Sequence, residues 1–143
     1  MVSGSTLLLV EDNQDIAEMM FAYLEHRGYV LDYAADGVTG LHLAVSNNYD
    51  VIVLDLMLPG MDGLDGLKRM LAQDNARGVA LISGTANREI ADAALAAGAS
   101  GFLPKTLSAK SVVNAVRFMA MGEQYAPLEF MRAEEDDTPD LAA

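Results

Sequence analysis

The sequence predicts an α/β fold in which helices cover both faces of a parallel sheet. Five short apolar runs alternate with segments whose apolar residues recur at helical spacing, and this alternation is typical of parallel strands joined by crossover helices. Hydrophobic residues make up 52% of the chain and aromatic residues only 6%, so the core should consist of Val, Leu, Ile, Ala and Met. The length of 143 residues fits a single domain with its own core.

The five apolar runs are the predicted strands. They are Leu7–Val10, Val30–Ala34, Val51–Leu54, Val79–Ile82 and Gly101–Leu103. The second run contains Asp32, whereas a central strand that is buried on both faces reads as continuously apolar. We therefore expect the second strand to lie at an edge of the sheet.

Three of the intervening segments carry apolar stripes that should face the sheet. The stripes are Ile16, Met19, Met20, Tyr23 and Leu24; then Leu64, Leu67 and Leu71; then Val112, Val116 and Met119. The segment between the fourth and fifth strands is mostly alanine, so it buries little apolar area per residue. We expect that helix to be held loosely and to be the mobile part of the fold.

The charge balance and the absence of cysteine exclude several classes of protein. Nine Lys and Arg stand against 21 Asp and Glu, which gives a net charge of −12, whereas a duplex-binding surface needs clustered cations. Disulfides, thiolate metal sites and cysteine nucleophiles are excluded, and no apolar run approaches the length of a membrane span. We expect a cytoplasmic protein that contacts neither nucleic acid nor a membrane.

Polar residues follow four of the predicted strands, at the point where each strand ends. They are Glu11, Asp12, Asp55, Ser83 and Lys105. In an open parallel sheet the carboxyl ends of strands line the ligand-binding crevice, so we expect these side chains to converge. Three converging carboxylates repel one another unless a cation lies among them, and hard oxygen ligands select Mg²⁺, Ca²⁺ or Mn²⁺ over softer metals. Of these we expect Mg²⁺, with Mn²⁺ as a substitute, because Mg²⁺ uses one or two carboxylates and completes its shell with waters and phosphate oxygens.

This set suits phosphoryl transfer to a carboxylate. Asp55 would be the nucleophile, because attack on phosphorus needs positioning and cations more than further covalent help. Lys105 would supply a cation, Ser83 a hydroxyl donor, and the loop around Pro59 and Gly60 backbone N–H groups. Taken singly the residues have ordinary roles: Asp12 as the cap of a helix that begins near residue 14, Asp55 as a turn cap, and Lys105 as a surface lysine. The functional interpretation depends on the set.

Four segments resemble the receiver domains of two-component response regulators. They are Leu-Leu-Val-Glu-Asp at 8–12, Val-Ile-Val-Leu-Asp-Leu-Met-Leu-Pro-Gly-Met-Asp-Gly at 51–63, Leu-Ile-Ser-Gly at 81–84 and Ala-Gly-Ala-Ser-Gly-Phe-Leu-Pro-Lys-Thr at 97–106. The resemblance implies a flavodoxin-like fold of CheY type, with a five-stranded parallel sheet in the order 2-1-3-4-5 and five helices. It covers a receiver domain at residues 5–122, which leaves 123–143 as an acidic linker or tail that we expect to be disordered from about 133.

The resemblance implies a role for each matched residue. It makes Asp55 the phosphoacceptor, Asp12 a direct metal ligand, Glu11 an acidic neighbour that acts mainly through water, Met57 a metal ligand through its backbone carbonyl, Ser83 the switch hydroxyl, Lys105 the phosphate-binding lysine, and Phe102 the aromatic residue whose rotamer follows activation. Met57 and Thr85, two positions past Asp55 and Ser83, would tune the lifetime of the phosphoryl group.

Three positions depart from the pattern of the family. Glu11 stands where many relatives have a second Asp, and Phe102 stands where Tyr is common, so a switch there would work by packing. Thr106 follows the lysine where proline is frequent. A cis bond to a non-proline residue costs about 2.5 to 4 kcal/mol, which leaves the usual cis peptide after Lys105 open.

The expected function is a switch that takes a phosphoryl group from a sensor histidine kinase or a phosphotransfer protein. Self-phosphorylation and slow hydrolysis would be its only catalysis, and homodimerisation on activation is a further expectation. The segments at 97–106 and 118–127 look most like the NarL/LuxR-type subfamily, which implies a DNA-binding output domain outside this chain.

Several alternatives remain beside that function. They are a stand-alone receiver, an aspartyl-phosphate phosphatase, and a flavin- or nucleotide-binding module, whose phosphate the acidic loop at 11–14 would repel. His26 and His42 fall in predicted helices and are assigned no function.

Overall fold

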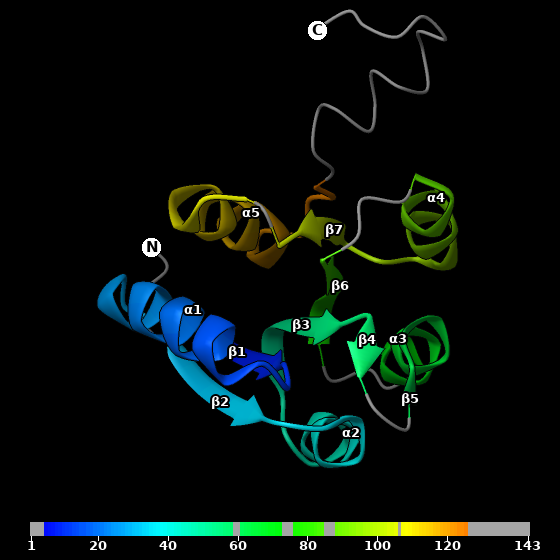
Figure 1. The fold of residues 1–143 in the computed structure, drawn as a ribbon, viewed down its shortest axis with the longest axis horizontal. Coiled ribbons are helices and arrows are strands. Elements are labelled where there is room, and N and C mark those ends of the chain that lie inside the picture. Colours follow the sequence, from blue (N-terminus) through cyan, green and yellow to red (C-terminus); the bar gives the residue numbers. More distant parts are fainter. Residues whose placement is uncertain (1–4, 59–60, 73–75, 85–87, 106, 126–143) are drawn as a thin grey trace, which may run out of the picture.

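Five parallel strands form the central sheet of the computed structural model, which describes residues 5–58, 61–72, 76–84, 88–105 and 107–125 (Figure 1). In sheet order the strands are β2 (Val30–Ala34), β1 (Thr6–Val10), β3 (Tyr49–Asp55), β6 (Ala76–Ser83) and β7 (Gly101–Pro104). Because the strands are numbered along the chain with two short extra strands between β3 and β6, this is the expected order 2-1-3-4-5. The predicted fold is confirmed.

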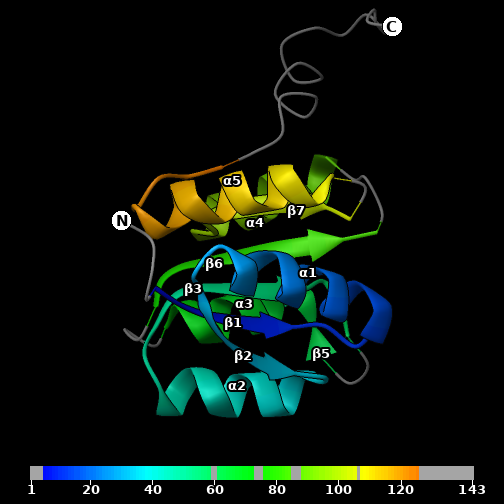
Figure 2. The same ribbon diagram turned by 90° about the vertical axis from the view of Figure 1, so that its left-hand side faces the viewer.

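Five helices cover the two faces of this sheet. They are α1 (Gln14–His26), α2 (Gly37–Ser46), α3 (Gly63–Leu71), α4 (Arg88–Ala97) and α5 (Ala109–Ala120). In Figure 1, α1 and α5 lie on the left of the sheet, and α3 and α4 lie on the right with α2 below them. Figure 2, which looks onto the face of the sheet that α1 and α5 cover, shows α2 at the β2 end and α4 and α5 at the β7 end.

Alternate residues of the central strands feed two separate hydrophobic cores. Leu7 and Leu9 of β1 pack with α1 and α5, whereas Leu8 and Val10 pack with the opposite layer. All four side chains are fully buried. Successive residues of these strands therefore face opposite cores, although apolar and polar residues do not alternate in the sequence. Both faces of a parallel sheet are covered by helices, so both need apolar residues.

The edge position of β2 is confirmed. Most of its residues are exposed, and Asp32 lies at the surface of the sheet. The carboxylate of Asp32 accepts a hydrogen bond of 2.6 Å from the hydroxyl group of Tyr49. Burial and this carboxylate together raise the pKa of Tyr49. Asp32 thus gives the buried phenol of Tyr49 a hydrogen-bond partner. A central strand, buried on both faces, would not tolerate an Asp at this position.

Two predictions about the elements need correction. In α1, Met19 and Tyr23 do not face the sheet: their exposed fractions are 47% and 43%. The buried face consists of Ala17, Met20 and Leu24. Successive helical residues are about 100° apart around the helix axis, and the apolar stripe is wider than the part of the helix surface that contacts the sheet.

The second correction concerns the loop after β3. Residues Met57–Leu58 (β4) and Met61–Asp62 (β5) form a small antiparallel ribbon that the sequence analysis did not predict. Strands of two residues are too short to produce a periodic pattern.

The described chain remains attached to the sheet beyond α5. Tyr125 pairs with Gly101 at the free edge of β7: its N–H donates to the carbonyl of Ser100 at 2.6 Å, and its own carbonyl accepts from Phe102 at 3.3 Å. The predicted disordered tail lies outside the described residues. Within the ranges that the structure describes, no helix combines the length and the hydropathy that crossing a bilayer requires.

Candidate functional site

The carboxyl ends of β1 and β3 bring three carboxylates together. Val10 is in register with Leu54, so Glu11 and Asp12 leave β1 beside Asp55 at the end of β3. One oxygen from each of the three carboxylates lies within 4.8 Å of the other two. Glu11 and Asp55 are 0% and 1% exposed, whereas Asp12 is exposed at the mouth of the site. The predicted convergence of these three residues is present.

Lys105 is the cation that faces this cluster. It follows β7, and its backbone N–H donates to the carbonyl of Ser83 at 2.7 Å. Its ammonium group lies 3.0 Å and 3.1 Å from the two carboxylate oxygens of Glu11, and 3.2 Å from Oδ2 of Asp55. One side chain therefore bridges the two buried carboxylates.

Burial and charge act against each other on these groups. Burial raises the pKa of Glu11, and the Asp55 charge raises it further, although hydrogen bonds from the Asn13 N–H and from Lys105 pull it down. Burial of the Lys105 ammonium lowers its pKa, but the hydrogen bond to Glu11 and the charges of Asp55 and Glu11 outweigh burial, so that its pKa is raised. Lys105 is held as a cation, while burial keeps the pKa of Glu11 raised in spite of its hydrogen bonds.

The donor set fits a hard divalent cation. Three carboxylates with a single ammonium group leave excess negative charge, and Oε1 of Glu11 receives no hydrogen bond from the described residues although the ammonium lies 3.0 Å away. Mg²⁺ prefers one or two carboxylates together with waters and phosphate oxygens. The exposed carboxylate of Asp12 offers such an ion a first ligand from the solvent side.

The loop after β3 wraps back onto Asp55. The N–H of Met57 donates to Oδ1 of Asp55 at 3.1 Å, and the N–H of Leu56 donates to the carbonyl of Ile82 at 2.8 Å. The Met57 side chain is 70% exposed. Pro59 and Gly60, which were expected to shape this loop, lie outside the described residues, as do Thr85, Thr106 and the peptide bond after Lys105.

Ser83 and Phe102 come from the two strands on the β7 side of Asp55. Ser83 ends β6 in register with Pro104 and is fully buried. Phe102 is fully buried in the core beneath α3 and α4, and its backbone N–H bonds to Tyr125. The roles assigned to both residues by resemblance stay predictions.

Two residues of the site were missed by the sequence analysis. Asn13, not Asp12, caps α1: its side chain accepts from the N–H of Ile16 at 3.1 Å. The hydroxyl group of Tyr33 donates to the backbone carbonyl of Glu11 at 2.7 Å. An Asn directly before a helical stripe was a readable cap signal, whereas the reach of Tyr33 from a neighbouring strand depends on strand register, which no local pattern reveals.

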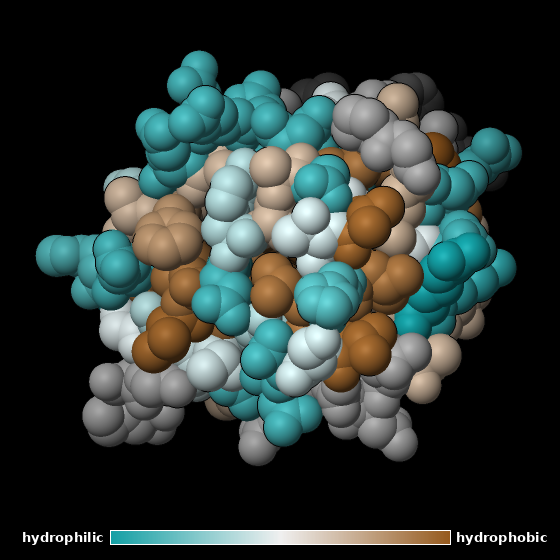
Figure 3. Space-filling view, turned by 90° about the horizontal axis from the view of Figure 1, so that it is seen from below, coloured by the Kyte–Doolittle hydropathy of each residue, from teal (hydrophilic) through white to brown (hydrophobic). Residues whose placement is uncertain are grey.

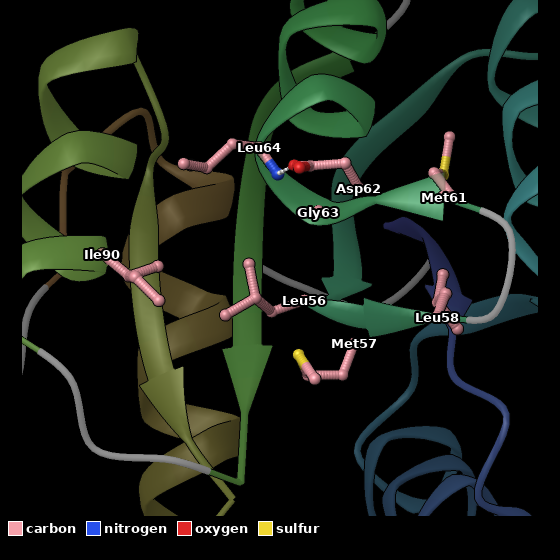
Figure 4. Close-up of a pocket in the computed structure, with 8 residues that line it drawn as sticks. All are labelled: Leu56, Met57, Leu58, Met61, Asp62, Gly63, Leu64 and Ile90. Atoms are coloured by element: carbon pink, nitrogen blue, oxygen red, sulfur yellow. Dashed lines mark hydrogen bonds between the residues drawn. The ribbon is translucent and has the colours of Figure 1, made fainter.

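An apolar groove of about 560 Å³ adjoins the loop after Asp55 (Figure 4). The side chains of Leu56 and Ile90 approach it from opposite sides, and Met57 lies at its rim. Asp62 closes one end and accepts hydrogen bonds from the N–H groups of Leu64 and Asp65, at 2.9 Å and 3.2 Å. The loop is thus tied to the first turn of α3.

Comparison with known proteins agrees with this geometry. Residues 7–117 match the family described as the response regulator receiver domain. This chain belongs to that family. It is 34% identical to the response regulator ArlR of Staphylococcus saprophyticus over 79% of this chain and 51% of the relative. It is 38% identical to the transcriptional regulatory protein HprR of Escherichia coli over 78% of this chain and 49% of the relative.

Solved receiver structures share the fold. The signal receiver domain of the putative response regulator NarL from Mycobacterium tuberculosis superposes with a TM-score of 0.78 at 29% identity, over 85% of this chain and 99% of that one. The receiver chain spans about half the length of the curated relatives that it matches. Receiver domains are signalling modules and not metabolic enzymes.

Proposed function

We propose that Asp55 is the phosphoacceptor of this receiver and that Glu11, Asp12 and Asp55 hold Mg²⁺. One observation carries the proposal: the nearly buried Asp55 carboxylate lies 3.2 Å from the Lys105 ammonium, with two further carboxylates grouped around it. A structural ion pair would need one acid for one base. Three acids with one base leave room for a metal ion and a phosphoryl group.

The reacting atoms follow from the contacts of Asp55. A carboxylate oxygen of Asp55 attacks phosphorus, forming a new P–O bond, while the bond from phosphorus to the donor's leaving group breaks and its electron pair departs with that group. The Met57 N–H at Oδ1 and the Lys105 ammonium at Oδ2 fix the plane of the carboxylate before attack. Bound Mg²⁺ would neutralise charge on the transferred oxygens.

Lys105 would exchange partners during the reaction. It now contacts Glu11 and Asp55, and phosphoryl oxygens on Asp55 would offer it a stronger anion. Because its backbone N–H is bonded to Ser83, a shift of Lys105 reaches the end of β6 directly. By the resemblance to receiver domains, Ser83 would be the switch hydroxyl and Phe102 the residue that repacks, with Met57 and Thr85 tuning the access of water to the phosphoryl group.

The donor would be a sensor histidine kinase or a phosphotransfer protein, and the output would be transcription. The matched relatives are named as response and transcriptional regulators and are about twice as long as the matched segment, which supports an output domain beyond the receiver. The motif at 97–106 supports a NarL/LuxR-type protein. The curated relatives that match this chain are instead named ArlR and HprR. Residues 5–122 would be the receiver and 123–143 the linker.

Intact-protein mass spectrometry tests the proposal. The protein is incubated with acetyl phosphate and Mg²⁺, beside Asp55→Asn and, as a matched control, Asp65→Asn on the exposed surface of α3. We expect one phosphoryl adduct on the unaltered protein and on Asp65→Asn, no adduct on Asp55→Asn, and no adduct in EDTA. An adduct that survives in Asp55→Asn would overturn the assignment.

A further inference from the structure

The short ribbon after Asp55 carries two methionines on opposite sides. In such a ribbon paired residues share a side, and successive residues alternate between the two sides. Met57 pairs with Asp62 and both are exposed, whereas Leu58 pairs with Met61 and both pack against the core. The Met57 side chain is 70% exposed, the highest value among the methionines that the structure describes. The register of the ribbon therefore presents one thioether sulfur to solvent, two residues after Asp55.

The other methionine of the ribbon is shielded by two glycines. The Met61 sulfur fills the space that a Cβ would need at Gly37 of α2 and at Gly66 of α3, and a Cβ at Gly66 would lie 2.9 Å from it. Three further methionines are at most 6% exposed: Met20, Met70 and Met119. An oxidant dissolved in water should therefore reach the Met57 sulfur before it reaches any of these four.

The chemistry of sulfur separates Met57 from exposed hydrocarbon side chains. Apolar groups reach the surface elsewhere too, and in the view from below they appear brown among teal polar groups (Figure 3). A side chain such as Val38, which is 77% exposed, has no lone pair that a peroxide can oxidise. A thioether sulfur takes one oxygen atom from hydrogen peroxide and becomes a sulfoxide, losing two electrons, while the peroxide is reduced to water. The reaction turns an apolar side chain into a polar one.

The position of Met57 gives this oxidation a consequence for the site. Its N–H donates to Oδ1 of Asp55 at 3.1 Å, so the side chain begins beside the carboxylate. The side chain also lines the apolar groove, together with Leu56, Leu58, Leu64 and Ile90 (Figure 4). A thioether can rest against those apolar walls, whereas a sulfoxide would lose its hydrogen bonds to water there. The oxidised side chain should therefore stay in the solvent near Asp55.

We propose that Met57 is a site of oxidation by peroxides and that its sulfoxide shortens the lifetime of the phosphoryl group, which depends on Asp55 being the phosphoacceptor. A thioether sulfur is a weak hydrogen-bond acceptor, whereas a sulfoxide oxygen accepts strongly and holds water at the mouth of the site. Hydrolysis consumes that water. Its oxygen bonds to phosphorus, the P–O bond to Asp55 breaks with its electron pair returning to the carboxylate, and inorganic phosphate leaves with the protons of the water.

The expected change in rate is that of one added hydrogen bond. A bond of ordinary strength that places the attacking water corresponds to roughly a threefold to tenfold change in rate. We therefore expect the half-life of the phosphoryl adduct to fall by about threefold or more. The urea midpoint should stay the same, because oxidation alters a side chain that already lies mostly in solvent.

Limited treatment with hydrogen peroxide, followed by peptide mass spectrometry, tests the oxidation. We expect one added oxygen atom on Met57 while Met61 and the three buried methionines are still unmodified. An oxygen atom on Met61 while Met57 remains unmodified would overturn the assignment, and so would a folded protein whose Met57 resists the treatment.

The half-life of the acetyl phosphate adduct, followed by intact-protein mass spectrometry after the donor is removed, tests the consequence. Met57→Leu has no sulfur at this position, so its half-life should be the same before and after peroxide. Met57→Gln places a polar acceptor there without oxidation, and its adduct should be short-lived before any treatment. Met121→Leu is the matched control, at a methionine that is 62% exposed at the end of α5, and it should respond to peroxide as the unaltered protein does.

The possible failures differ from one another. An unchanged half-life after complete oxidation of Met57 refutes the effect on hydrolysis and leaves Asp55 as the phosphoacceptor. A half-life that still falls in Met57→Leu places the sensitive residue elsewhere, most plainly at Met121 if Met121→Leu no longer responds. The absence of an adduct on the untreated protein refutes the phosphoacceptor assignment and the effect on lifetime together.

Discussion

Replacing Lys105 by methionine should destabilise the protein through the two carboxylates that Lys105 now serves. Methionine keeps the length and most of the apolar stem of lysine but removes the ammonium group. That group lies 3.0 Å from Glu11 and 3.2 Å from Asp55, which are 0% and 1% exposed. Both carboxylates would remain buried and facing each other with no cation between them.

The magnitude follows from the degree of burial. Removing one partner of a fully buried ion pair typically costs about 3 to 5 kcal/mol. The Lys105 side chain is 18% exposed, and water already reaches Asp12 at the mouth, so we expect a smaller loss of about 2 to 3 kcal/mol at pH 7 in EDTA. With the usual slopes of urea unfolding, this is a shift of roughly 1 to 2 M in the midpoint.

The dependence on pH has a definite sign. The folded-state pKa of Glu11 is already raised by burial, so protonation of Glu11 favours folding, and loss of Lys105 raises that pKa further. The deficit of the variant should therefore shrink as the pH falls from 7 to 5. The folded-state pKa of Lys105 is raised above 10.5, so the stabilisation it gives is complete below that value and is lost as the pH rises through the folded value.

Urea unfolding at pH 5 and pH 7, with and without Mg²⁺, checks this reasoning. Mg²⁺ should recover more stability in Lys105→Met than in the unaltered protein, because the ion replaces the missing charge. Lys110→Met, at an exposed lysine of α5, should stay within about 0.5 kcal/mol of the unaltered protein. A loss of less than 1 kcal/mol, or one that is equal at both pH values, would refute the account.

Three further changes have outcomes set by the structure. Gly40→Ala should lower the free energy of unfolding by about 1 kcal/mol or more despite better helix propensity, because the added Cβ would lie 2.8 Å from both methyl groups of the fully buried Val10; an unchanged urea midpoint would contradict this. Asp62→Ala should cost about 1 kcal/mol by removing the cap of α3, while Asp62→Asn, which keeps the accepting oxygen, should cost clearly less in the same assay. Tyr33→Phe removes the hydrogen bond to the Glu11 carbonyl and should weaken Mn²⁺ binding, followed by electron paramagnetic resonance, by about tenfold with little change in unfolding; equal affinity would make Tyr33 a purely structural residue.

The layered fold was predictable because both of its signals are local. Continuous apolar runs mark strands that are buried on both faces, and Asp32 marks the strand that is not. The ends of the strands were less predictable: β6 begins at Ala76, three residues before the apolar run that predicted it. Backbone pairing with β3 extends the strand there, and pairing leaves no trace in hydropathy.

The acidic site was predictable as a set of residues but not as a set of contacts. The rule that strand ends converge placed Glu11, Asp12, Asp55 and Lys105 together without any knowledge of distances. It could not show that the lysine bridges two of the acids while the third stays in solvent. It also missed Tyr33, since its contact depends on the pairing of β2 with β1.

The contacts of Lys105 imply that stability and signalling are opposed at this site. Without a metal ion the lysine is needed to hold Glu11 and Asp55, so it cannot serve a phosphoryl group at the same time. A cation bound beside Asp12 would neutralise part of the carboxylate charge, so that the Lys105 ammonium could bind phosphoryl oxygens. Glu11→Gln removes a carboxylate whose charged form is disfavoured by burial and by the Asp55 charge, so it should stabilise the metal-free fold while weakening Mg²⁺ binding. A variant that gained both stability and Mg²⁺ affinity would show that the repulsion among the carboxylates is not what recruits the cation.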